Sequence, residues 1–173
     1  HQGYNFTVFA NITGNLHRYG FVDAKGGMIR HYGESADPSA LPRYVNHPFL
    51  NVWLQYLSGE LLGRGAWSIR LPAILSSTAL VGLVCWAGRR RSGWLLALVA
   101  MAFAAFLPIR AVYARMPDSL MPATFFALLT VCAYFEWRST ERLRWLLVCL
   151  SSMVAGCWTD WNAYFVVPPI LMH

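Results

Sequence analysis

An arginine and an aspartate lie just before a long apolar run. In "YARMPDSLMPATFFALL", residues 113–129, Asp118 follows Pro117, and Arg115 lies shortly before them. One interpretation is structural, because an aspartate can accept hydrogen bonds from the free N–H groups of a helix's first turn and an arginine can anchor at a membrane surface. The other interpretation is that Arg115 and Asp118 form half of an active site.

A second acid lies between two apolar runs. Asp160 occurs in "GCWTDWNAYF", with Trp158 and Trp161 on either side. The aromatic belt of a membrane protein accounts for the tryptophans but not for the acid. An ionisable residue at the edge of a helical bundle indicates a functional site, and a solvated turn is the alternative.

A histidine precedes a predicted helix in "YVNHPFLNVWLQYL". A lone histidine is usually structural. At the start of a helix, however, free N–H groups favour an anion, so His47 is also a candidate for binding a phosphate. Its polar neighbours are Arg43, Tyr44 and Asn46.

The composition indicates the elements that must position these residues. Hydrophobic residues make up 57% of the chain and charged residues only 13%, whereas soluble domains are about a quarter charged. This predicts an integral membrane protein, an all-α bundle with several spans. The net charge of +6 comes with two arginine clusters, 89–91 and 138–144, that lie between apolar runs. Neither cluster has a soluble domain around it, which argues against nucleic acid as a partner.

The apolar runs predict the spans and their orientation. A span needs about 20 mostly apolar residues, and the candidates are 67–88, 94–109, 119–137, 143–158 and a truncated run at 163–173. Arginine is enriched on the cytoplasmic side, so both clusters are expected there. The polar segments 1–66, 110–118 and 159–162 then all face the extracytoplasmic side.

The first 66 residues contain two helical patterns. Apolar residues at helical spacing predict helices at about 4–19 and 48–63, from Phe9, Ile12, Leu16 and Tyr19 in the first and Leu50, Trp53, Leu54, Leu57 and Leu61 in the second. Amphipathic helices beside spans are expected to lie in the membrane interface. Residues 21–46 between them are predicted to form a loop.

Three motifs, in order, resemble those of the GT-C glycosyltransferases that use polyprenyl-phosphate sugars. This superfamily includes the protein O-mannosyltransferases and the aminoarabinose transferase. "NHPFLNVWLQYLSGELLGRGAWSIRLPAIL" resembles their "HPPL…W…LFG…W…ARLP" stretch, and "YARMPDSLMPATFFALL" resembles their second outer loop. "GCWTDWNAYFVVPPILMH" is similar to the "TDWPAYF" variant of bacterial dolichyl-phosphate-mannose-type transferases. The resemblance covers nearly the whole chain.

The resemblance implies a membrane enzyme, in a bacterial inner membrane or its equivalent, that passes a sugar from a polyprenyl-phosphate donor to a hydroxyl on the outer face. In such enzymes an acid acts as the base on the acceptor, and basic groups, sometimes with a divalent metal, hold the leaving phosphate. It implies that Asp118 and Asp160 orient or deprotonate the acceptor, or bind a metal. The implied substrate-binding residues are His47, Arg115, Tyr44 and Trp161, of which His47 and Arg115 would face the donor phosphate.

The sequence also departs from the family pattern. The family carries an acid early in its first outer loop, but no Asp or Glu occurs here before Asp23, and Phe49 replaces a proline of "HPPL". The family fold also has many more spans than this chain. These features predict an N-terminal fragment of the enzyme, or, as the alternative, a non-catalytic GT-C-derived subunit of a larger membrane complex.

Overall fold

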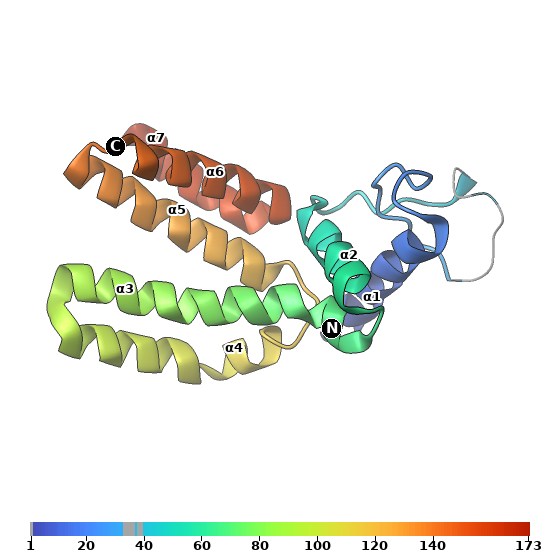
Figure 1. The fold of residues 1–173 in the computed structure, drawn as a ribbon, viewed down its shortest axis with the longest axis horizontal. Helices are drawn as coiled ribbons and strands as arrows, with labels where there is room; N and C mark the ends of the chain where they lie inside the picture. Colours follow the sequence, from blue (N-terminus) through green and yellow to red (C-terminus); the bar gives the residue numbers. More distant parts are fainter. Residues whose placement is uncertain (1, 33–36, 38–39) are drawn as a thin grey trace.

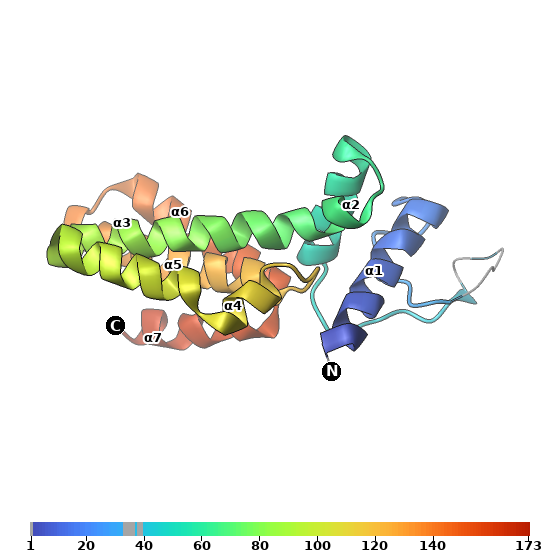
Figure 2. The ribbon, with the colours of Figure 1, turned by 90° about the horizontal axis from the view of Figure 1, so that it is seen from below.

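The computed structural model describes residues 2–32, 37 and 40–173. Its elements, in order, are α1 (Gln2–Tyr19), α2 (Leu50–Leu62), α3 (Ala66–Phe106), α4 (Pro108–Tyr113), α5 (Leu120–Thr140), α6 (Leu143–Thr159), the 3-10 helix η2 (Trp161–Val166) and α7 (Val167–Met172). The described residues form no β-strand beyond one isolated bridge between Ile29 and Arg43. Figures 1 and 2 show α3, α5, α6 and α7 running side by side, with α1 and α2 at one end of this bundle.

The long helix α3 is two helical arms joined by a sharp turn. Gly93, at the turn, has φ 83° and ψ 176°, and a residue without a Cβ adopts this conformation readily. The chain turns back on itself there (Figure 1). The arms correspond to the runs predicted at 67–88 and 94–109, although the second arm ends at Phe106.

The remaining apolar runs form three helices and a 3-10 segment. The runs predicted at 119–137 and 143–158 are α5 and α6, whereas 163–173 divides between η2 and α7. Among the described residues, α3 and α5 are long and apolar enough to span a membrane, and α6 is apolar but shorter. Crossing by the other elements stays a prediction.

The bundle buries some hydroxyl groups and exposes large apolar side chains. Thr130 of α5 and Ser152 of α6 are buried and share a hydrogen bond of 2.9 Å. Phe103 and Phe106 are 71% and 85% exposed. An apolar outer surface of this kind suits contact with lipid.

The outer part has an apolar core of its own. Phe9, Ile12 and Leu16 of α1 are buried together with Met28 and Ile29 of the following loop. The prediction that this stripe lies in the membrane interface was therefore wrong, because the periodicity identifies an apolar face but not what covers it. The predicted loop 21–46 supplies the cover, although residues 33–36 and 38–39 of it lie outside the described part.

Helix α2 buries its other face. Leu57 and Leu61 of the apolar stripe are 52% and 71% exposed, whereas Asn51 and Gln55 are each 1% exposed. The placement of α2 in the membrane interface stays a prediction. The buried face carries polar groups to the end of the bundle.

Candidate active site

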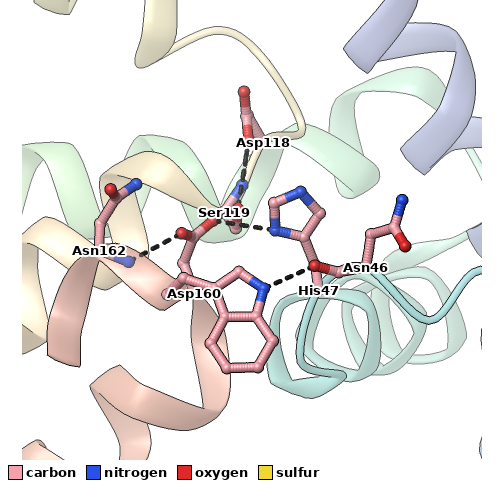
Figure 3. Close-up of polar contacts among 7 residues, drawn as sticks. Asn46, His47, Asp118, Ser119, Asp160 and Asn162 are labelled. Atoms are coloured by element: carbon pink, nitrogen blue, oxygen red, sulfur yellow. Dashed lines mark hydrogen bonds and ion pairs between the residues drawn. The ribbon is translucent and has the colours of Figure 1, made fainter.

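Three separate segments meet at the end of the bundle beside α2. His47 lies just before α2, Asp118 lies just before α5, and Asp160 lies between α6 and η2. Figure 3 shows their side chains gathered around Ser119. The structure thus brings together three of the residues that the sequence nominated, from positions far apart in the chain.

Asp160 is the centre of this cluster. Its side chain is buried, with the residue 5% exposed, which contradicts the alternative of a solvated turn. One carboxylate oxygen, Oδ1, accepts a hydrogen bond from the backbone N–H of Asn162 at 3.1 Å and so caps η2. The other, Oδ2, accepts from the hydroxyl of Ser119 and lies 3.4 Å from Nδ1 of His47, the distance of an ion pair.

The Asp160–His47 contact favours the charged form of both groups. Burial opposes ionisation of Asp160, but the neighbouring His47 ring and the hydrogen bonds from Ser119 and the Asn162 backbone outweigh it and hold its pKa below the ordinary value. The Asp160 carboxylate in turn raises the pKa of His47 against the effect of burial, and the nearby charge of Asp118 adds to the rise. The contact therefore favours a carboxylate beside an imidazolium.

Asp118 is buried, but it does not cap α5. The N-cap residue is Ser119, whose backbone is already helical (φ −74°, ψ −17°) and whose side chain makes no capping bond. Oδ1 of Asp118 instead accepts from the Ser119 backbone N–H at 2.6 Å and from its hydroxyl at 3.3 Å. The capping interpretation of Asp118 was therefore wrong, and Ser119 links the two carboxylates.

A chain of buried hydrogen bonds fixes the loop that carries Asp118. Nε2 of Gln55 donates to the carbonyl of Pro117 at 2.9 Å, and its Oε1 accepts from the Thr13 hydroxyl at 2.8 Å. These bonds connect α1 and α2 to the entrance of α5. On the other side, the indole N–H of Trp161 donates to the carbonyl of Asn46 at 2.6 Å, which connects η2 to the segment that carries His47.

Close helix packing sets the position of Asp160. A Cβ added to Gly156, one turn earlier in α6, would lie 3.1 Å from the Cβ of Ala163 and 3.2 Å from that of Phe126. No larger residue fits there without a shift of its neighbours. Gly156 thus lets α6 approach both α5 and η2 closely.

Two aromatic rings lie beside His47, and a buried amide without hydrogen bonds to the described residues follows it in the sequence. The ring of Tyr44 stacks on it at 5.7 Å between centroids, and the ring of Phe9 lies at 6.1 Å. This amide belongs to Asn51, four residues after His47, on the face of α2 that also carries Gln55. Within the described part of the chain, neither polar atom of its buried amide has a hydrogen-bond partner.

Sequence reasoning missed Ser119, Gln55 and Asn51. A serine beside an aspartate carries no specific signal. Asn51 and Gln55 do have one, since they are four residues apart on α2 and opposite its leucine stripe, which places both on one face. A polar pair on the face turned away from an apolar stripe is normally predicted to face solvent, but here it is buried.

Other predicted participants stand apart. Arg115 lies in the exposed turn after α4, and in the part of the chain that the structure describes its side chain has no hydrogen bond or ion pair. Trp161 is 53% exposed and contributes its indole N–H to Asn46. Among the described residues, no group of three or more His, Cys, Asp or Glu side chains is arranged to hold a metal ion.

An apolar groove adjoins the cluster. It has a volume of about 320 Å³ and is lined by Pro48, Met153, Val154, Cys157, Trp158 and Tyr164. Pro48 follows His47, and Trp158 lies two residues before Asp160. The groove therefore places an apolar surface directly beside the polar cluster.

The comparison with known families covers this cluster. A family model described as dolichyl-phosphate-mannose-protein mannosyltransferase matches residues 46–173, a range that contains His47, Asp118 and Asp160. No curated protein and no solved structure matches the chain.

Proposed function

The chain belongs to the dolichyl-phosphate-mannose-protein mannosyltransferase family, membrane glycosyltransferases of the GT-C type, and from this we propose that it forms part of an enzyme that moves a sugar from a polyprenyl-phosphate donor to an acceptor hydroxyl on the extracytoplasmic face. The observation that carries the proposal is the buried cluster of His47, Asp118 and Asp160. Burying charged groups costs free energy, and such groups gather at functional sites.

His47 would bind the donor phosphate. Nδ1 of its imidazolium faces Asp160, which leaves Nε2 to donate to a phosphate oxygen. During transfer the bond between the sugar C1 and the phosphate oxygen breaks, and the electron pair stays on the phosphate. A fixed positive charge stabilises this developing negative charge. Arg115, exposed at the entrance of α5, would approach the same phosphate from the solvent side.

Asp118 would act as the general base. The acceptor oxygen attacks C1 of the sugar, and its proton passes to a carboxylate. Asp160 is engaged with His47 and its pKa is lowered, so its role is to orient His47 and favour its charged form. Tyr44 stacks on the imidazole and limits its orientation.

The groove beside α6 would hold the first units of the donor's lipid chain. It begins at Pro48 and Trp158, next to the proposed phosphate position, and its lining is almost wholly apolar. A phosphate at His47 would thus have its hydrocarbon chain directed along α6 toward the membrane.

Sugar transfer by Asp118→Asn tests the proposal. We expect the full chain with this substitution to lose transfer from a polyprenyl-phosphate sugar by about 100-fold or more, the usual contribution of a general base. Asp23→Asn is the matched control, because Asp23 is an exposed acid of the outer segment. Unchanged transfer by Asp118→Asn, at equal expression and thermal stability, would exclude Asp118 as the base.

One observation favours a second candidate, a non-catalytic GT-C-derived subunit. The family resemblance places an acid early in the first outer loop, and the sequence has none before Asp23. If this candidate holds, neither Asp118→Asn nor His47→Gln changes transfer in membranes that contain the chain, although loss of the whole chain does. The enzyme proposal predicts a loss with each substitution.

A further inference from the structure

Both arginine clusters lie at the end of the bundle opposite to Asp160. Residues 89–91 immediately precede the turn of α3 at Gly93. Arg138 ends α5, and Arg142 and Arg144 begin α6. Both turns lie at the left of Figure 1, whereas α2 lies toward the right. This end therefore carries six arginines and only two acidic residues, Glu136 and Glu141, which gives it a net positive charge.

A cavity opens between these turns. Its volume is about 530 Å³, within the range of small-molecule sites, and it is lined by Arg90, Arg91, Phe135, Glu136, Ser139 and Thr140. The arginines come from the turn of α3 and the other residues from the last turns of α5. The cavity is therefore a gap between two helices with guanidinium groups on one wall.

Arg90 is held in place by a buried carboxylate. Its Nη2 donates to Oε2 of Glu136 at 2.7 Å, and its Nε donates to Oε1 at 3.3 Å. Nη1 lies outside this pair and keeps its two N–H donors. The pair neutralises Glu136, so an anion in the cavity does not meet an uncompensated carboxylate.

Arg91 and Arg89 rest on aromatic rings. The guanidinium carbon of Arg91 lies 4.3 Å from the centre of the Phe135 ring, and that of Arg89 lies 4.6 Å from the Trp94 ring. Within the described part of the chain, Arg91 has no carboxylate partner. The hydroxyls of Ser139 and Thr140 already donate to the Glu136 carbonyl, so the arginines supply the donors for an anion.

Exposed apolar side chains follow each of the two turns in the sequence. Leu95, just after the turn of α3, is 77% exposed, and Leu143, at the start of α6, is 65% exposed. A soluble anion would leave these side chains without contacts, whereas an amphiphile would cover them. A planar guanidinium fork matches the oxygens of a phosphate.

We propose that this cavity binds the phosphodiester head of an anionic phospholipid, with Arg90 and Arg91 on the phosphate and the acyl chains against Leu95 and Leu143. The site is separate from the sugar-transfer site and does not depend on transfer activity. Basic pockets between membrane helices on the cytoplasmic side are suited to such heads, so the proposal also assigns this end of the bundle to the inner leaflet.

Native mass spectrometry of the full chain in detergent tests the proposal, with phosphatidylglycerol titrated against phosphatidylcholine. Wild-type protein should retain phosphatidylglycerol preferentially, and Arg91→Gln should weaken its retention about fivefold, the effect of roughly 1 kcal/mol per arginine. Arg64→Gln is the matched control, since Arg64 is an exposed arginine next to α2 and its loss should change nothing. Arg90→Gln is avoided because it would leave buried Glu136 unpaired.

Other results of the same experiment would overturn the proposal. Equal retention of the two lipids, or no effect of Arg91→Gln at an unchanged melting temperature, would overturn the proposal. Displacement of phosphatidylglycerol by millimolar inorganic phosphate would mean that the cavity holds a soluble phosphate, which also overturns it.

Discussion

The outer part of the chain and the helical bundle differ in how much large apolar surface they leave exposed. In the outer part, Ile12, Leu16 and Met28 are fully buried. In the bundle, Thr130 and Ser152 are buried while the phenylalanines of the second α3 arm are exposed. Water favours burial of apolar surface, and hydrocarbon favours burial of polar groups. The two arrangements indicate that each part is folded for a different solvent.

The candidate site lies where these two parts meet. His47 belongs to the outer part, and both acids belong to the bundle. Gln55 of α2 connects the parts through its hydrogen bonds to Thr13 and to Pro117. A reaction between a lipid-linked donor and a water-borne acceptor needs such a boundary, because one reactant comes from each solvent.

The largest difference in stability is expected between substitutions of buried apolar residues in the outer part and substitutions of exposed apolar residues in the bundle. Ile12→Ala in the outer core should lower the free energy of unfolding by about 2–5 kcal/mol, because it leaves a cavity. Phe106→Ala, at an 85% exposed position of the bundle, should change it little. Chemical unfolding in detergent measures both, and equal losses would contradict the contrast between the two parts.

A smaller loss should follow from breaking the connection between the parts. Gln55→Leu leaves the Thr13 hydroxyl and the Pro117 carbonyl unpaired, which should cost about 1–3 kcal/mol and lower transfer through displacement of Asp118. Asn51→Leu, on the same buried face, is the matched control, because that amide has no partner among the described residues. Equal destabilisation by both substitutions would mean that the Gln55 hydrogen bonds contribute nothing.

The smallest effect concerns pH. The pKa of His47 is raised above its ordinary value of 6.5, so its contribution to stability is full below 6.5 and is lost as pH rises through the raised value. The pKa of Asp160 is lowered, so its contribution is lost only in acid. The melting temperature should therefore fall slightly from pH 6 to pH 9, and His47→Gln should flatten this fall. An identical fall in both proteins would show that the pair does not titrate in this window.

The sequence predicted the positions of the helices better than it predicted which residues pack against them. Apolar runs fixed the positions of α5 and α6 because the pattern is local. The cover of the α1 stripe is a long-range property, supplied by Met28 and Ile29 across a turn. The capping interpretation of Asp118 was wrong for a local reason, since α5 begins one residue later than a cap by Asp118 requires.

The candidate site was predicted as separate residues and not as a cluster. The resemblance nominated His47, Asp118 and Asp160, but their meeting depends on packing between segments that no periodicity relates. Ser119 completes the cluster through contacts to both acids, which spacing alone does not reveal. The same resemblance suggested Arg115, which is exposed and makes no hydrogen bond or ion pair with the described residues.

A double-mutant cycle on sugar transfer tests the central claim, that His47 and Asp160 act as one phosphate-binding pair at the boundary. The full chain would be assayed as wild type, His47→Gln, Asp160→Asn and the double variant, with Asp23→Asn as the control. The account predicts a large loss in each single variant and no further loss in the double variant, because residues that act as a unit are not additive. Losses that multiply, or single variants with wild-type transfer, would contradict it.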